Sequence, residues 1–290
     1  FGVPEMGIEG AAWATVVSLW TKAGVFWWLI HKQEYVDVYR IGDIWRFDAA
    51  VMRRLLYYGA PNGFQVFVDV AGFTGFTLLV GSLGKEAMTA TTLAFNVNSV
   101  AFVPMIGIGM AISTIVGQQQ GANKPELSAR ATWSGFLLAA IYMGSFSVMY
   151  LAVPDLFLFG FAANSSPEEF AALRNTVVVL LRFVAAYGLF DAMNVVFVSA
   201  IKGAGDTQFV VWANIAIAAG GVGLGWYGVA ALGWGLTECW WVVTAWICAL
   251  GVTFFARFLQ GRWRTMQVIE QDVIPTEAKV ATVALGEEAA

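Results

Sequence analysis

The sequence predicts an all-α fold, a polytopic transmembrane helix bundle of about seven spans. First, 59% of the 290 residues are apolar and only 12% are charged, about half the charge of a typical soluble domain. Second, the apolar residues gather into segments of ~20 residues or more, the length that crosses a bilayer as a helix. Third, none of these segments alternates polar and apolar residues, as strands of a membrane barrel would. This composition excludes an ordinary soluble enzyme, a nucleic-acid-binding protein and a secreted disulfide domain.

Each apolar segment is interpreted as one helix. The seven segments cover residues 8–30, 54–81, 87–117, 131–153, 175–201, 208–228 and 232–256. The polar residues Gly81–Glu86 predict a turn between the second and third segments. The last two segments form one apolar stretch that is too long for a single span. We expect the glycine-rich cluster at 223–228 to be the turn that divides it.

The distribution of Lys and Arg predicts the orientation in the membrane. Most basic residues lie on one side of the bundle, in 32–54, in 118–130, at Lys202 and in 257–264. Cytoplasmic loops carry the excess of basic residues. We therefore expect a multi-pass protein of the plasma (inner) membrane with a cytoplasmic C-terminus. The polar, mildly acidic residues 261–290 are expected to form a disordered cytoplasmic tail.

Two acidic residues lie deep within apolar segments. Asp69 is 15 residues after Arg54, and Asp191 is 11 residues before Lys202, so both are expected near the middle of the bilayer. Neither has a basic residue three or four positions away. A buried carboxylate without a counter-ion must be protonated or must bind a cation from solution. Because ionisable residues within spans are energetically expensive, both mark a functional site.

Polar neighbours extend this candidate site. Asn62 and Gln65 lie on the same helix face as Asp69, and Tyr187 and Asn194 flank Asp191 in the same way. The third segment contributes Asn96. An alternative role for the amides is hydrogen bonding between helices. The predicted site for a coupling cation or a cationic substrate comprises Asp69, Asp191, Tyr187, Gln65, Asn62, Asn194 and Asn96, with Asp69 and Asp191 as possible Na⁺ ligands.

A third acidic residue suggests a different class of protein. Gly203-Ala-Gly-Asp206 fits the GxGD pattern of intramembrane aspartyl proteases, in which two acids at one depth share a proton. The sequence has no Tyr-Asp dipeptide to supply the second acid, and Asp206 lies at the membrane edge. We expect Asp206 to cap the helix that follows it, and we expect no enzymatic activity.

Several motifs in order resemble one transporter family. Gly59-Ala-Pro61 is followed by an acidic residue eight positions after the proline. Asn96-Val-Asn98 leads to Pro104-Met-Ile-Gly-Ile-Gly109, and Phe190-Asp191 precedes Lys-Gly-Ala-Gly-Asp-Thr. Together with Gly7–Thr15 and Phe258–Arg264, their order and spacing resemble the second half of the multidrug and toxic compound extrusion (MATE) transporters.

This resemblance implies an organisation and a function. Residues 1–31 would be the last helix of an N-terminal lobe, 32–53 a cytoplasmic linker between lobes, and 54–260 a C-terminal six-helix lobe. Five helices of the first lobe would be missing, and the start at Phe1 without a leader is expected to reflect a truncation. Asp69 stands where bacterial members have Glu, which leaves the choice of coupling ion open.

The family exports small organic cations in exchange for Na⁺ or H⁺ and needs no other cofactor. Two carboxylates that hold either ion or substrate, but not both, would couple the two by mutual exclusion while the lobes rock within the lipid bilayer. A related lipid or polysaccharide flippase is the alternative, although the acidic midplane favours cationic cargo. The resemblance implies no nucleic-acid partner.

Overall fold

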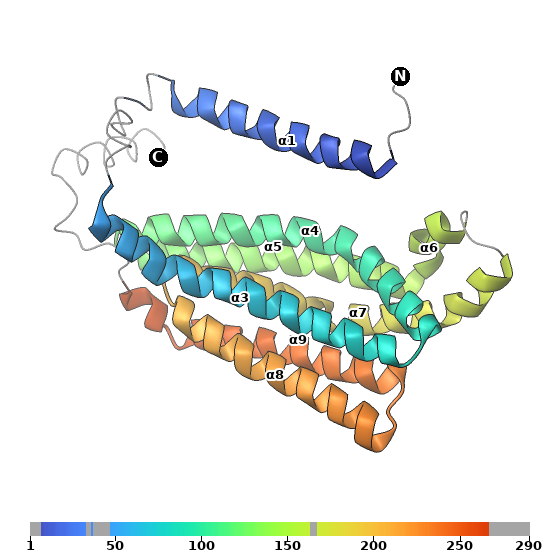
Figure 1. Cartoon of the computed structure of the whole chain (residues 1–290). Helices are drawn as coiled ribbons and strands as arrows, with labels where there is room; N and C mark the ends of the chain where they lie inside the picture. The colour runs from blue at the N-terminus through green and yellow to red at the C-terminus, as the bar shows by residue number, and fades with distance from the viewer. Residues whose placement is uncertain (1–6, 33–35, 37–46, 163–166, 267–290) are drawn as a thin grey trace. The chain divides into compact units, whose positions relative to one another are not determined.

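The computed structural model describes residues 7–32, 36, 47–162 and 167–266, and every regular element within them is a helix (Figure 1). The chain divides into two compact units, Phe1–Leu56 and Tyr57–Ala290. Each unit is described by itself. The predicted all-α class is confirmed.

The first unit contains α1, Gly7–Ile30, a helix of 24 residues without a buried side chain. Its bounds match the predicted segment 8–30. It is long enough to span a membrane but is not among the six helices that are also sufficiently apolar. Its four tryptophans and Lys22 lower its hydropathy. Most of the predicted linker 32–53 lies outside the described residues.

The second unit contains the remaining helices. Their bounds are α3 Ala49–Ser82 (which begins in the first unit), α4 Lys85–Gly121, α5 Pro125–Ala152, α6 Pro154–Ala162, α7 Pro167–Gly203, α8 Thr207–Leu232, α9 Leu236–Leu259 and the short 3₁₀ helix η2 Arg262–Thr265. Six helices are long and apolar enough to cross a membrane, namely α3, α4, α5, α7 from Leu173 onward, α8 and α9. The short α6 lies between two of them and was not expected from the sequence.

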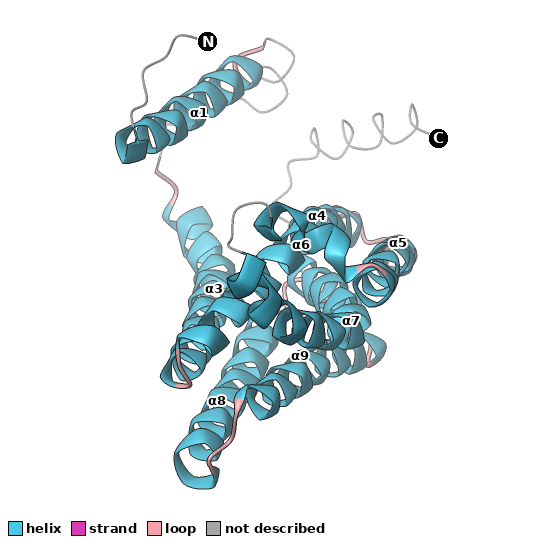
Figure 2. Ribbon diagram, turned by 90° about the vertical axis from the view of Figure 1, so that its right-hand side faces the viewer, coloured by secondary structure: helices cyan, strands magenta, loops and turns pink. Residues whose placement is uncertain are grey.

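Helix α7 lies at the centre of this unit and packs against α4, α5 and α9 (Figure 2). Glycines allow backbones to approach closely at these contacts. A Cβ atom at Gly203 would lie 2.4 Å from the carbonyl oxygen of Ser113 on α4. A Cβ atom at Gly251 on α9 would lie 2.5 Å from the carbonyl oxygen of Phe190 on α7. Each helix pair therefore requires glycine at its crossing point.

The predicted turn at 223–228 is wrong. Helix α8 continues through these residues to Leu232, and the chain turns at Gly233, whose φ of 68° is left-handed. Gly225 and Gly228 instead make room for the side chains of Leu79 and Trp234. Because small residues are common where membrane helices pack, glycine there signals contact rather than a break.

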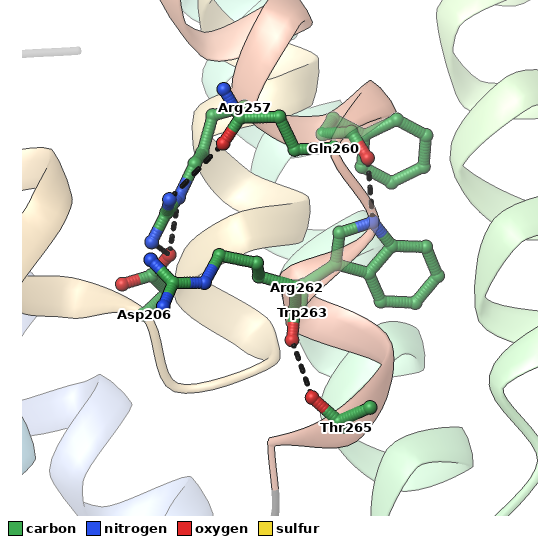
Figure 3. A network of polar contacts seen from close by, with 7 residues as sticks. Asp206, Arg257, Gln260, Arg262, Trp263 and Thr265 are labelled. Carbon is green, nitrogen blue, oxygen red and sulfur yellow. Dashed lines mark hydrogen bonds and ion pairs between the residues drawn. The ribbon is translucent and has the colours of Figure 1, made fainter.

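The turn between α7 and α8 is held by a buried ion pair (Figure 3). Arg257 on α9 lies 2.7 Å from Asp206, and the two side chains are only 11% and 9% exposed. The same guanidinium stacks over Phe209 at 4.2 Å. Asp206 precedes α8 but makes no capping hydrogen bond from its side chain, so the predicted cap is wrong. Its carboxylate binds Arg257 instead, because burial requires a charged partner.

The predicted disordered tail begins too early. Residues 262–265 form η2, and Trp263 is buried. The side-chain amide of Gln120, at the end of α4, donates hydrogen bonds to the carbonyl oxygens of Trp263 and Arg264 at 3.0 and 2.9 Å. These bonds attach the segment after α9 to α4. The rest of the predicted tail, 267–290, lies outside the described residues.

Candidate functional site

Asp191 lies in the well-packed middle of α7 and is 7% exposed. Among the described residues, its carboxylate has no ion pair and no hydrogen bond from another side chain. Tyr187, one turn earlier, is 1% exposed and interacts electrostatically with Asp191. A second buried tyrosine, Tyr150 on α5, interacts with Tyr187, and its own hydroxyl has no hydrogen-bond partner. The site therefore holds a buried carboxylate without an ion-pair partner among the described residues, with the tyrosine Tyr187 one turn away.

Asp69 lies in a more open environment on α3. The residue is exposed, and its carboxylate accepts a 3.2 Å hydrogen bond from the side-chain amide of Gln65 one turn earlier. The carbonyl oxygen of that amide is buried and unpartnered. Gly72 and Phe76 continue the same buried face. Gln65 thus orients the carboxylate and leaves an oxygen free to contact a ligand.

Contacts between helices give the relative heights of these two acidic residues. Gly72, three residues after Asp69, faces Trp246 of α9. Five residues after Trp246, Gly251 contacts Phe190 of α7. Helices α7 and α9 run in the same direction and α3 runs opposite, so at ~1.5 Å per residue the two acidic residues lie at similar heights.

The structure adds a charged group that sequence reasoning missed. Lys202, near the end of α7, is half-buried, and its charge acts on the Asp69 carboxylate only from beyond ion-pair distance. The sequence places no basic residue beside Asp69, and among the described residues no ion pair contradicts that prediction. No short-range pattern could have found Lys202, because the two residues are 133 positions apart on different helices.

The other predicted site residues are placed differently. Asn62 and Asn96 are exposed, whereas Asn194 is half-buried, one turn after Asp191. On α4 it is Asn98 that is buried, with an unpartnered side-chain oxygen. Asn98 and the buried residues Ala94, Ala101 and Met105 follow one another at intervals of three or four, the spacing of one helix face. This spacing is a signal that could have selected Asn98 from the sequence.

The side-chain atoms of these residues that could bind a cation are all oxygens. Carboxylates, amide carbonyls and tyrosine hydroxyls suit alkali cations, organic cations or protons better than soft transition metals. Within the described residues, no group of three His, Cys, Asp or Glu side chains could hold a metal ion.

Six helices long and apolar enough to cross a membrane, one of which carries a buried acidic residue, define a multi-pass membrane protein with the features of a transporter. The MatE family model matches residues 61–226, more than half of the chain. The chain belongs to the MatE family, the transporters that its motifs resemble.

Curated relatives extend this finding. The chain is 27% identical over 209 residues to a probable multidrug resistance protein NorM of Thermotoga maritima, covering 71% of this chain and 43% of the relative. It is 26% identical over 284 residues to a probable multidrug resistance protein NorM of Pseudomonas putida, a match that covers 97% of this chain and 60% of the relative. The chain thus spans about half the length of the curated relatives it matches.

Solved structures share the fold. An outward-facing multidrug resistance MATE family transporter of the MOP superfamily superposes with a TM-score of 0.63 at 18% identity, covering 78% of this chain and 49% of that one. A MOP superfamily transporter from Pyrococcus furiosus, described as having a binding pocket of reverse polarity, matches with the same score and coverage. Members of this family are transporters, so the protease alternative is wrong. Asp206 is, in addition, bound by Arg257.

Proposed function

We propose that the chain is part of a cation-coupled antiporter that exports small organic cations, with Na⁺ or H⁺ as the coupling ion. Asp69 and Asp191 hold either the coupling ion or the cationic cargo. Tyr187 and Gln65 position these carboxylates, and Asn194, Asn62 and Asn96 line the approach to them.

One observation carries this proposal, the buried carboxylate of Asp191 without a charged or hydrogen-bonding partner among the described residues. A buried charge of this kind requires a proton or a cation. A second carboxylate, that of Asp69 on α3, is exposed and would give an arriving cation a first point of contact. Occupation by one cation excludes another, which couples uptake of one to release of the other.

The organisation of the whole protein belongs to the same proposal. Residues 54–260 form one six-helix lobe, residues 1–31 the last helix of the preceding lobe, and 32–53 the linker between them. The side of the membrane with most Lys and Arg residues is cytoplasmic, and the membrane is the inner membrane. Alternating access arises from movement of this lobe against the other.

Efflux from cells that express the gene tests the proposal. Asp69→Asn and Asp191→Asn each remove a charge while keeping the side-chain size, and each is expected to reduce ethidium efflux to the level of cells without the gene. Asp155→Asn is the matched control, because Asp155 is an exposed acid that binds Arg174 far from the site. Binding of ethidium to the purified proteins shows whether the loss arises at the site.

Unchanged efflux in both site variants, at equal amounts of protein in the membrane, would overturn the proposal. The flippase alternative predicts a different specificity. It would be supported if the wild-type protein bound vesicles containing an anionic lipid in preference to ethidium, because basic rather than acidic groups would then select the cargo.

A further inference from the structure

The segment that follows α9 folds back onto α9. Gly261 has a left-handed φ of 73° and turns the chain into η2. The indole ring of Trp263 stacks on Phe258, with the ring centroids 4.9 Å apart and the planes 8° apart. Its N–H donates a 2.9 Å hydrogen bond to the carbonyl oxygen of Phe258 (Figure 3). These contacts fix η2 against the last turn of α9.

One side chain of α4 holds the same segment. The amide nitrogen of Gln120 lies 3.0, 2.9 and 3.0 Å from the carbonyl oxygens of Trp263, Arg264 and Met266. Gln120 is 8% exposed, and its amide oxygen is buried without a hydrogen-bond partner among the described residues. The last carbonyl groups of a short 3₁₀ helix have no partners within the helix. Gln120 therefore supplies the donors that this end of the chain lacks.

Two ion pairs extend these contacts to neighbouring helices. Arg264 in η2 lies 3.3 Å from Glu126 in the first turn of α5. Arg257 in the last turn of α9 binds Asp206, in the turn between α7 and α8, at 2.7 Å. The first pair is exposed and contributes little by itself, whereas the second is buried. The end of the chain from Arg257 onward thus contacts α4, α5 and the turn between α7 and α8.

We propose that residues 261–266 form a strap, locked by Gln120, that couples the end of α9 to the adjoining ends of α4 and α5, so that these helix ends loosen only together. The inference is independent of the proposed function, because none of these residues belongs to the acidic site. The simpler alternative is a local cap, in which Trp263 and Phe258 end α9 and the bonds to Gln120 couple nothing across the bundle.

Hydrogen exchange of the purified protein, followed peptide by peptide by mass spectrometry, tests the coupling from both sides. Gln120→Glu replaces the donors with a carboxylate among three carbonyl oxygens, so exchange in the strap is expected to be about tenfold faster. Trp263→Ala removes the ring that attaches the strap to α9. It is expected to speed exchange by a similar factor at the end of α4 and the start of α5, whose sequences it leaves unchanged.

Matched variants separate the strap from general effects. Gln118→Glu makes the same change at an exposed position within one turn of Gln120 and should leave exchange in the strap as in the wild type. Gln120→Leu removes the donors without adding a charge and should release the strap as Gln120→Glu does. Trp212→Ala removes a tryptophan of α8 that is 70% exposed and should leave exchange in α4 and α5 unchanged.

Two outcomes would overturn the inference. In Trp263→Ala, faster exchange confined to α9 and the strap would leave only a local cap. Exchange in the strap that is no faster in Gln120→Glu than in Gln118→Glu would exclude Gln120 as the lock. If Trp263→Ala does not yield folded protein, Trp263→Leu, which keeps an apolar side chain but removes the stacked ring, gives the same comparison.

Discussion

Helices α7 and α3 carry the two acidic residues of the site in contrasting surroundings. In the most apolar part of α7, 56% of residues are buried, against 28% in α3. Helix α7 packs against α4, α5 and α9, and Asp191 lies within this packing without a partner. Helix α3 presents Asp69 on a more open face, with Gln65 as its hydrogen-bond partner. One helix therefore buries an acidic group without a partner, and the other exposes an acidic group that a neighbouring amide orients.

The largest expected effect tests the difference in packing between α7 and α3. Gly251→Ala would place a Cβ atom 2.5 Å from the carbonyl oxygen of Phe190, and backbone atoms cannot move aside. Overpacking of this kind lowers the free energy of unfolding by about 1–3 kcal/mol. Gly72→Ala on α3 meets only the ring of Trp246, a side chain that can shift, so its loss should be smaller.

Thermal unfolding of the purified variants shows which of these two substitutions lowers stability more. Gly63→Ala is the control, because a Cβ atom there has no neighbour within 4 Å; alanine in a helix should leave stability unchanged or raise it. A loss in Gly72→Ala equal to that in Gly251→Ala would show that α3 is packed as rigidly as α7.

A smaller expected effect tests the difference in electrostatic surroundings between Asp191 and Asp69. Asp191→Asn replaces an uncompensated buried carboxylate with a neutral amide and is expected to raise the free energy of unfolding by about 1 kcal/mol. Asp69→Asn changes an exposed carboxylate that accepts one hydrogen bond from Gln65 and should change the free energy of unfolding by less than about 0.5 kcal/mol. Unfolding of the purified variants at pH 8 measures both changes. If the two variants changed stability by the same amount, the contrast between the two acidic residues would not hold.

The sequence predicted the parts of this arrangement that depend on local spacing. Long apolar segments located the six membrane helices, and the polar residues Gly81–Glu86 located the turn between α3 and α4. The depth of Asp69 and Asp191 in the membrane, which rests on their distance to the segment ends, stays a prediction. The glycines of α8 were misread because glycine favours both turns and close helix contacts.

Pairings across the bundle could not be predicted. Arg257 binds Asp206 from 51 positions away, and Gln120 reaches the carbonyl of Trp263 from 143 positions away. Such contacts are products of tertiary packing, which neither hydrophobic periodicity nor motif spacing records.

The smallest expected effect lies at the far end of α7, where Arg174 binds Asp155 of α6 through two hydrogen bonds of 2.6 Å. These bonds lower the pKa of the Asp155 carboxyl below its ordinary value of 3.8. The pair therefore stabilises the folded state above that ordinary pKa and loses its effect as the pH falls through the lowered one.

Because both side chains are exposed, Asp155→Asn should lower the unfolding temperature only slightly at pH 6. Below about pH 4 the difference from the wild type should shrink as the wild-type carboxyl takes up a proton. A difference that stayed constant down to pH 3 would show that Asp155 supports α6 and α7 by some means other than its charge.

The close approach of Gly203 to Ser113 has a consequence for how these helices could move. Where two backbones touch with no side chain between them, the helices have little room to slide past each other. If the lobe moves during transport, as the proposed function requires, α4 and α7 would therefore move as one body, within the microseconds to milliseconds of collective helix movements.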